Sequence, residues 1–296
     1  MKKACILIFL HLLCFIPKAQ DNVLVSTDWL AKNLDKVVVL HVGINRQSYE
    51  NGHIPEARFL AWSDIVTTKN GIPNELNSVE NLQKVFTNLG IGNNKKIILY
   101  GDLQGLAAAR AFFTLEYLGL SGRVAVLDGG IEKWKAEKRP ISTVPVTPNP
   151  EEFIIRLNPD IVIGIDQVSD ISWLITNRNS SNFSLIDARP PEEYKGERPG
   201  EGITRPGHIP GAFNIFWQQN IISRDNPVMK PKEELKKLYA QAGASPNKIN
   251  VVYCRTGGQA SHAYFTLRYL GYNVKLYDGS YFEWQSQKDT KVILGK

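Results

Sequence analysis

Short apolar runs alternate with stretches of helical period in the second half of the chain. The expected strands are residues 184–187, 249–253 and 274–277, and the expected helices are residues 232–242 and 259–270. Each helical stretch is followed by a glycine, Gly243 or Gly271, which is typical of a helix C-terminus. Buried strands separated by helices are typical of a parallel sheet with helices on both faces. The pattern therefore predicts an α/β fold.

Three short motifs occur twice, in the same order and at similar separations. The pairs are residues 52–57 and 207–212, residues 113–119 and 265–271, and Asp128-Gly129 with Trp134 against Asp278-Gly279 with Trp284. Such a repeat indicates duplication of a whole domain of about 120 residues rather than a solenoid. The chain is thus expected to hold two tandem domains, each a parallel-type sheet flanked by helices on both faces.

The stretch between the copies is rich in proline. Residues 139–150 contain four prolines and no helical period, which predicts an extended linker. We therefore place the first domain at residues 22–140, the linker at 141–158 and the second domain at 159–290.

The N-terminus has the pattern of a secretory signal peptide. Lys2 and Lys3 precede an apolar run over residues 4–16, and Ala19 follows as a small residue near a cleavage point. The run is too short to span a bilayer comfortably. Residues 1–20 are therefore predicted to be a signal peptide, with a periplasmic or secreted mature protein and no stable membrane anchor after cleavage. The alternative is a buried helix or an uncleaved anchor, and a cytoplasmic protein if the segment is no functional signal.

Cleavage would change both the charge and the cysteine count. Hydrophobic residues make up 43% of the chain and charged residues 22%, a globular composition. The net charge of +6 is too small to argue for nucleic acid. Loss of residues 1–19 removes three lysines and no acid, so the charge falls to +3, and it leaves Cys254 as the one cysteine. A lone thiol in an exported protein forms an intermolecular crosslink or is reactive.

Cys254 follows a predicted strand and precedes a predicted helix. Gly257 and Gly258 allow the positive φ angles that turn successive amides inward as an anion-binding nest. The helix N-terminus and Arg255 add positive charge, and all three effects favour the thiolate, which is the nucleophile. The alternative is a buried cysteine that merely packs.

The Cys254 loop, both copies of the paired motifs and Asp187-Ala188-Arg189 together resemble the two-domain rhodanese family of thiosulfate and 3-mercaptopyruvate sulfurtransferases. The resemblance covers nearly all of residues 22–290. It implies that Cys254 takes the outer sulfur of a small-molecule donor as a persulfide. The sulfur then passes to cyanide or another thiophilic acceptor, and no cofactor is needed.

The resemblance also implies roles for the residues around Cys254. The expected donor-binding residues are Arg255, Thr256, Gly257, Gly258, Gln259 and Arg189, with Asp187 in support. Arg189 is interpreted either as a contact to the donor anion or as the structural partner of Asp187. Arg198 and Arg205 are weaker candidates, and Glu193 stands near a position where many relatives have an arginine.

The residue after the cysteine favours thiosulfate as the donor. The mercaptopyruvate branch typically has Cys-Gly-Ser-Gly at this loop, whereas Arg255 matches the cationic residues of the thiosulfate branch. Arg255 would hold the sulfonate oxygens of the thiosulfate dianion while sulfite departs. Thr256 stands where thiosulfate enzymes have a lysine, and 3-mercaptopyruvate remains the alternative donor.

The first copy is expected to be inactive. When Tyr100 is aligned with Tyr253, Gly101 occupies the place of Cys254 and Asp102 the place of Arg255. His41 falls near the position of Asp187. The first copy therefore has no nucleophile, and we interpret it as a packing partner that shapes the cleft.

Other classes of protein fit less well. A cysteine phosphatase has an arginine six residues after its nucleophile, where this chain has Ala260. A thioredoxin-like oxidoreductase needs a second cysteine. The five histidines have no metal-ligand spacing, so no metal is expected. A persulfide carrier or partner-binding module of the same fold is the non-enzymatic alternative.

Overall fold

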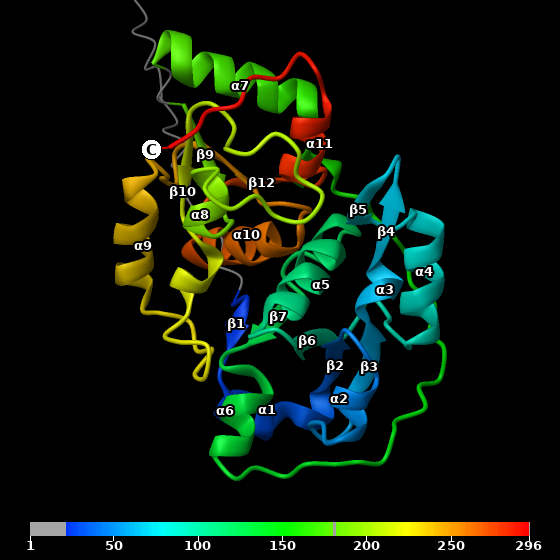
Figure 1. Cartoon of the computed structure of the whole chain (residues 1–296). Coiled ribbons are helices and arrows are strands. Elements are labelled where there is room, and N and C mark those ends of the chain that lie inside the picture. The colour runs from blue at the N-terminus through cyan, green and yellow to red at the C-terminus, as the bar shows by residue number, and fades with distance from the viewer. Residues whose placement is uncertain (1–21, 180–181, 296) are drawn as a thin grey trace, which may run out of the picture.

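The computed structural model describes residues 22–179 and 182–295, which form two α/β domains (Figure 1). The predicted signal peptide lies outside these residues. No helix in the described part of the chain is long and apolar enough to cross a membrane.

The first domain is built on a five-stranded parallel sheet. Its strands, in spatial order, are β1 (Leu24–Val25), β7 (Val124–Leu127), β6 (Lys96–Gly101), β2 (Val37–Gly43) and β3 (Arg58–Ala61). A short antiparallel hairpin of β4 (Val66–Lys69) and β5 (Ile72–Leu76) leaves this sheet and reaches toward the second domain (Figure 1).

The second domain repeats this sheet. Its strands, in the matching order, are β8 (Val162–Ile163), β12 (Val274–Tyr277), β11 (Ile249–Tyr253), β9 (Phe183–Asp187) and β10 (Ala212–Asn214). All of its pairings are parallel, so the predicted fold class and the duplication are confirmed. The strands expected from the apolar runs correspond to β9, β11 and β12.

Helices cover both faces of each sheet. Those of the first domain are α1 (Thr27–Asn33), α2 (Gln47–Glu50), α3 (Trp62–Ile65), α4 (Val79–Asn88), α5 (Leu106–Tyr117) and α6 (Gly130–Ala136). Those of the second are α7 (Ile165–Arg178), α8 (Pro191–Tyr194), α9 (Lys232–Gln241), α10 (Gly258–Leu270) and α11 (Ser280–Ser286). Short 3-10 helices occupy Leu34–Lys36, Pro159–Ile161 and Trp217–Asn220.

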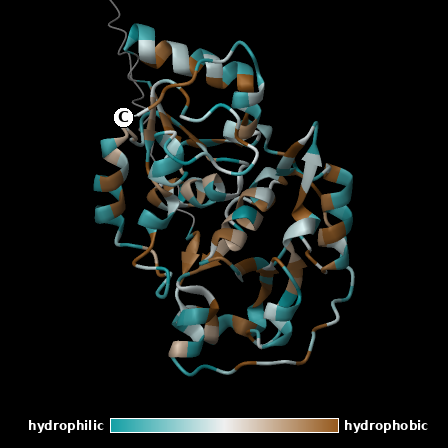
Figure 2. Ribbon diagram, in the orientation of Figure 1, coloured by the Kyte–Doolittle hydropathy of each residue, from teal (hydrophilic) through white to brown (hydrophobic). Residues whose placement is uncertain are grey.

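The strands send alternate side chains into two different cores. On β11, Val252 belongs to the core that also contains α10, whereas Val251 and Tyr253 belong to the core on the other face of the sheet. This is the period-two pattern of a strand that is buried on both faces. The strands accordingly appear hydrophobic along most of their length in Figure 2, whereas the outer helices are mixed.

The two domains share one core. Helix α5 of the first domain packs on α10 of the second, and the residues of both helices belong to a single buried cluster. Phe112 lies edge-on to Phe265, and Phe113 lies edge-on to Tyr264, each at 5.1 Å between ring centroids. The interface is therefore continuous with the hydrophobic core of each domain.

Two buried acidic groups are neutralised across the interface. Arg110 donates to both carboxylate oxygens of Asp278, at 2.5 and 3.2 Å. Glu116 accepts from the hydroxyl of Tyr264 at 2.8 Å and from the guanidinium of Arg268 at 2.9 and 3.0 Å. Each pair joins α5 to the second domain, so these charges fix how the domains face each other.

The linker is an ordered strap on the first domain. Ser142 forms a two-way backbone bridge with His53, and Phe153 is buried against Phe86. Figure 1 shows this segment passing along the edge of the first domain before it enters the second. Its extended conformation agrees with its proline content, and its contacts hold it to one path.

We predict that Arg110→Met lowers the free energy of unfolding by about 3–5 kcal/mol, because it leaves the buried Asp278 carboxylate without its partner. Urea titration measures this loss. Arg46→Met is the matched control, since Arg46 pairs with Glu50 at an exposed site and its loss is expected to cost at most about 1 kcal/mol. Equal losses in the two variants would contradict the role assigned to the interface pair.

Candidate active site at the Cys254 loop

The Cys254 loop begins where the central strand of the second sheet ends. Strand β11 ends at Tyr253 and helix α10 begins at Gly258, so the loop lies at the carboxyl edge of a parallel sheet, where ligands of α/β proteins bind. Gly257 precedes the helix with φ of +84°, a left-handed conformation that favours glycine. A Cβ atom there would also lie 2.7 Å from a carboxylate oxygen of Asp278.

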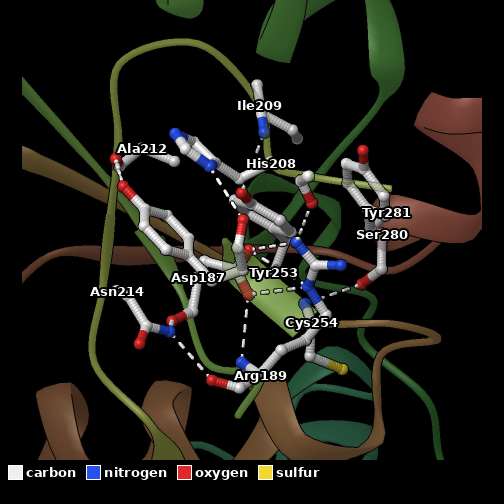
Figure 3. Close-up of polar contacts among 12 residues, drawn as sticks. Asp187, Arg189, His208, Ile209, Ala212, Asn214, Tyr253, Cys254, Ser280 and Tyr281 are labelled. Atoms are coloured by element: carbon white, nitrogen blue, oxygen red, sulfur yellow. Dashed lines mark hydrogen bonds and ion pairs between the residues drawn. The ribbon is translucent and has the colours of Figure 1, made fainter. Parts of the chain in front are cut away.

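A turn after β12 holds the backbone of the loop. The Cys254 amide donates to the hydroxyl of Ser280 at 3.2 Å (Figure 3). In return, the carbonyls of Cys254 and Arg255 accept from the amides of Tyr281 and Phe282 at 2.9 and 3.0 Å. Ser280 itself has a left-handed φ of +54°. The segment that supports the Cys254 loop, residues 280–282, therefore directly follows the repeated Asp278-Gly279 motif.

The Cys254 thiol is buried, and its surroundings act on its pKa in opposite directions. Burial raises the pKa of the thiol, and backbone N–H groups of Ala260, Thr256 and Gln259 lower it, while the charge of Asp187 raises it further. Because burial dominates, the pKa stays above its ordinary value. The expected lowering is therefore wrong for the ligand-free protein, although the predicted nest of amides is present.

Arg189 is a structural residue. Its guanidinium donates to both oxygens of Asp187 at 2.5–3.1 Å and to the carbonyl of Gly207 at 2.8 Å, and it lies 4.0 Å from the ring centroid of Tyr281 (Figure 3). Arg189 and Asp187 are both almost fully buried. This corrects the prediction that Arg189 binds the donor: its Nε and Nη2 groups donate inside the domain, its side chain is almost fully buried, and the pair braces β9 beside the loop.

Arg255 is already paired with an acid. Its guanidinium donates to Glu193 at 2.9 Å, and 30% of the Arg255 side chain is exposed against 8% of the Glu193 side chain. Burial raises the pKa of Glu193, and the charge of Arg255 opposes this rise. The cation predicted to bind the donor is therefore reachable, but it shares its charge with a buried carboxylate that the sequence reasoning did not assign to it.

A pocket of about 260 Å³ opens above the cysteine. Its lining consists of Cys254, Arg255, Thr256, Gly258 and Gln259 from the loop and Trp62, Leu103 and Leu106 from the first domain. Four of the five predicted loop contacts thus face one cavity with the sulfur. Gly257 instead turns the chain against Asp278. The volume suits a small donor.

The first domain also contacts the loop directly. Asn74, in strand β5 of the hairpin, donates to the Thr256 hydroxyl at 3.1 Å and accepts from the indole of Trp62 at 3.1 Å. Sequence reasoning missed Asn74, Trp62 and the apolar rim. The one available signal was that Trp62 and Trp217 each lie nine residues after the histidine of a repeated motif.

The corresponding loop of the first domain cannot accommodate a nucleophile. His41 pairs with Tyr100 as Asp187 pairs with Tyr253, which confirms the alignment of Gly101 with Cys254. A Cβ atom at Gly101 would lie 2.1 Å from the carbonyl oxygen of Val42. A cysteine therefore does not fit there without movement of the backbone.

Asp102 forms hydrogen bonds within the first domain. Its carboxylate accepts from the Ile44 amide at 2.9 Å and from the Ser48 hydroxyl at 3.1 Å, and it lies 3.4 Å from the ring of His41. The acid at the place of Arg255 is thus part of a structural network, as expected for an inactive copy.

The other candidate residues are structural or remote. The Arg205 guanidinium contacts the carbonyls of Gln285, Gln287 and Thr290, so it holds the C-terminal segment, while Arg198 is exposed and does not line the pocket. His53 and His208, which occupy matching positions in the two copies, stack on Tyr49 and Tyr194. Within residues 22–179 and 182–295, no group of histidine, cysteine and acidic side chains could hold a metal ion.

Fold and site together define a duplicated α/β protein whose described residues contain one free cysteine, Cys254, in an amide-lined loop beside the domain interface. The rhodanese-like domain model matches residues 26–137 and 170–287. The chain belongs to the rhodanese family of sulfurtransferases.

Curated relatives match over nearly the whole chain. "Sulfur carrier protein TtuD" of Thermus thermophilus is 38% identical over 291 residues, covering 94% of this chain and 99% of the relative. A "Putative thiosulfate sulfurtransferase" of Mycolicibacterium smegmatis is 35% identical over 287 residues, with the same coverage. The relatives thus carry both names, carrier and enzyme.

Solved structures of the same fold include an anaerobic ergothioneine biosynthesis enzyme from Chlorobium limicola in complex with trimethyl histidine. It superposes with a TM-score of 0.82 at 26% identity, covering 94% of this chain and 71% of that one. A second structure, of the enzyme EanB, holds a cysteine persulfide with ergothioneine, with a TM-score of 0.82 at 25% identity. This fold therefore carries persulfide chemistry in that enzyme.

We predict that Gly257→Ala lowers the sulfurtransferase activity on the order of 10–100-fold, because the added methyl group displaces the loop from Asp278. Gly105→Ala is the matched control. Gly105 precedes α5 with φ of +85°, but a Cβ atom there has open space, so it introduces the same backbone strain without the collision. Similar losses in both variants would show that strain, not contact with Asp278, causes the effect.

We predict that the Cys254 thiol titrates above about pH 8.5, the value of a free cysteine, because burial and the charge of Asp187 favour the neutral form. The thiolate fraction, and with it the rate of alkylation, therefore rises as the pH is raised through this range. The ultraviolet thiolate absorbance of the protein, minus that of Cys254→Ser, measures the midpoint. A midpoint near neutral pH would mean that the amide nest outweighs burial.

Proposed function

We propose that this protein transfers a sulfane sulfur from thiosulfate to cyanide or another thiophile through a persulfide on Cys254. The observation that carries the proposal is the loop itself: one cysteine, three backbone amides acting on its sulfur, and a small pocket that opens onto it.

The reaction has two displacements at sulfur. The Cys254 thiolate attacks the outer sulfur of thiosulfate, the S–S bond of thiosulfate breaks, and sulfite leaves with the electron pair. An acceptor such as cyanide then attacks the outer sulfur of the persulfide, and thiocyanate leaves as the thiolate is regenerated. The leaving groups are sulfite in the first step and the Cys254 thiolate in the second, and both are released as anions, so neither step needs a general acid.

The amides of the loop suit this chemistry. They stabilise negative charge on the sulfur with dipoles that are already oriented, so no reorganisation is needed at the moment of transfer. A small pocket rimmed by Trp62, Leu103 and Leu106 limits the water around the reacting atoms.

Arg255 supports thiosulfate over 3-mercaptopyruvate as the donor. A guanidinium beside the sulfur matches the sulfonate oxygens of thiosulfate, and almost a third of the side chain is open to solvent. 3-Mercaptopyruvate is the second candidate donor. The similarity to a sulfur carrier protein also favours delivery of the persulfide to a protein acceptor.

The test is to incubate the protein with thiosulfate and cyanide and to follow thiocyanate, with the mass of Cys254 as a second readout. We expect one added sulfur on the wild type and none on Cys254→Ser. No thiocyanate and no added sulfur in the wild type would overturn the proposal.

We further expect Arg255→Gly to reduce kcat/KM for thiosulfate about tenfold or more, and to reduce kcat/KM for 3-mercaptopyruvate by less. An equal loss with both donors would remove Arg255 as the selector.

A further inference from the structure

The ion pair between Glu193 and Arg255 is packed into the wall of the active site. The carboxylate lies on α8, 2.9 Å from the guanidinium, and only 8% of its side chain is exposed. Gly200 closes over the pair: a Cβ atom there would lie 2.5 Å from Nε of Arg255 and 2.8 Å from Oε2 of Glu193. The backbone therefore approaches both charged groups as only a glycine allows, and the pair is a built feature of the site.

Of the two residues of the ion pair, only Arg255 lines the pocket. Arg255 lines the pocket with Cys254, whereas Glu193 does not. A donor anion can therefore reach the guanidinium, but it meets a cation whose charge is already offset by a carboxylate on its far side. Glu193 acts on the donor through Arg255 and through space, without touching it.

The other arginines near the loop do not offer the donor a positive charge in place of Arg255. Arg110 is fully buried against Asp278, and Arg189 is buried against Asp187. Both pairs are close to neutral as units. Among the charged side chains of the described pocket lining, Arg255 is the one that faces the donor, so Glu193 determines how much positive charge the donor meets.

We propose that Glu193 is a specificity-determining residue that lowers the preference of the site for dianionic sulfur donors relative to monoanionic ones. This inference rests on the proposed function, since it concerns the donor of that same site. The physical reason is that Coulomb energy scales with the charge of the donor, so a fixed carboxylate disfavours a dianion twice as much as a monoanion.

The experiment compares two donors that present the same sulfane sulfur. Thiosulfate carries two negative charges, and an organic thiosulfonate such as methanethiosulfonate carries one. Glu193→Gln keeps the shape of the side chain and removes its charge. We expect kcat/KM to rise about tenfold for thiosulfate and about threefold for the thiosulfonate, which correspond to about 1.4 and about 0.7 kcal/mol.

Glu197→Gln is the matched control. Glu197 lies in the same segment but is exposed, with 63% of its side chain open and only a long contact to Lys195, so its change should alter neither donor by more than about twofold. Equal rises for both donors in Glu193→Gln would overturn the proposal. A fall for both donors would also overturn it, because it would show that the ion pair merely holds the loop.

A binding measurement separates this inference from the proposed function. In a Cys254→Ser background no sulfur is transferred, and calorimetry reports the affinity for intact thiosulfate. We expect Glu193→Gln to tighten thiosulfate binding about tenfold in that background and thiosulfonate binding about threefold. If wild type fails to form a persulfide but this difference in affinity appears, the proposed function fails and the charge selection stands. If the wild type turns over thiosulfate but Glu193→Gln does not change the two affinities differently, the proposed function stands and the charge selection fails.

Discussion

The ion pair of Arg110 and Asp278 is the interaction on which the rest of the site depends. Arg110 comes from α5 of the inactive domain, and Asp278 comes from the turn that supports the Cys254 loop. The same carboxylate accepts the amide of Leu76, and the same guanidinium donates to the carbonyl of Asn74. One buried pair thus fixes the hairpin, the interface and the wall against which Gly257 turns. A buried ion pair needs such partners, since removing one of them leaves a buried charge uncompensated at a cost of about 3–5 kcal/mol.

The two copies differ at the position of this pair. Asp128 occupies the place of Asp278 in the first domain and accepts the amide of Met229 across the interface, at 2.9 Å, as Asp278 accepts that of Leu76. His262 occupies the place of Arg110, counted from the repeated Phe-Thr-Leu motif. Burial lowers the pKa of His262 to about 4, so at neutral pH it offers no charge to Asp128. Both aspartates accept a backbone amide from the other domain, but of the two only Asp278, which lies beside the Cys254 loop, has an ion-pair partner among the described residues.

The sequence predicted two kinds of feature: the motifs that occur twice, and the strands and helices that show as apolar runs or as a helical spacing of apolar residues. Strands β9, β11 and β12 were evident because fully buried parallel strands are continuous apolar runs, and the duplication was evident because its motifs are copied. Cys254 and its loop were evident because a cysteine followed by Arg255 and two glycines stands between a predicted strand and a predicted helix. The partners of the charged groups were not, because they lie far along the chain: Glu193 and Arg255 are 62 residues apart, and Asn74 and Thr256 are 182 apart. The raised pKa of Cys254 was missed for a related reason, since burial is a property of the packed domains.

The charges near the cysteine show where anion stabilisation must come from. The three arginines near the loop, Arg110, Arg189 and Arg255, are each matched by a carboxylate, so their full charges largely cancel. What remains uncompensated is the set of backbone dipoles acting on the sulfur. Dipoles act over a short range, so they favour charge on the cysteine or its persulfide far more than charge on a distant part of a ligand. The dipoles therefore offset part of the cost that burial places on the sulfur anion common to both half-reactions, while the rest of the donor is held only by a partly neutralised cation, Arg255. That is what a two-step transfer requires, because the first product must leave before an acceptor of different charge can enter the same pocket.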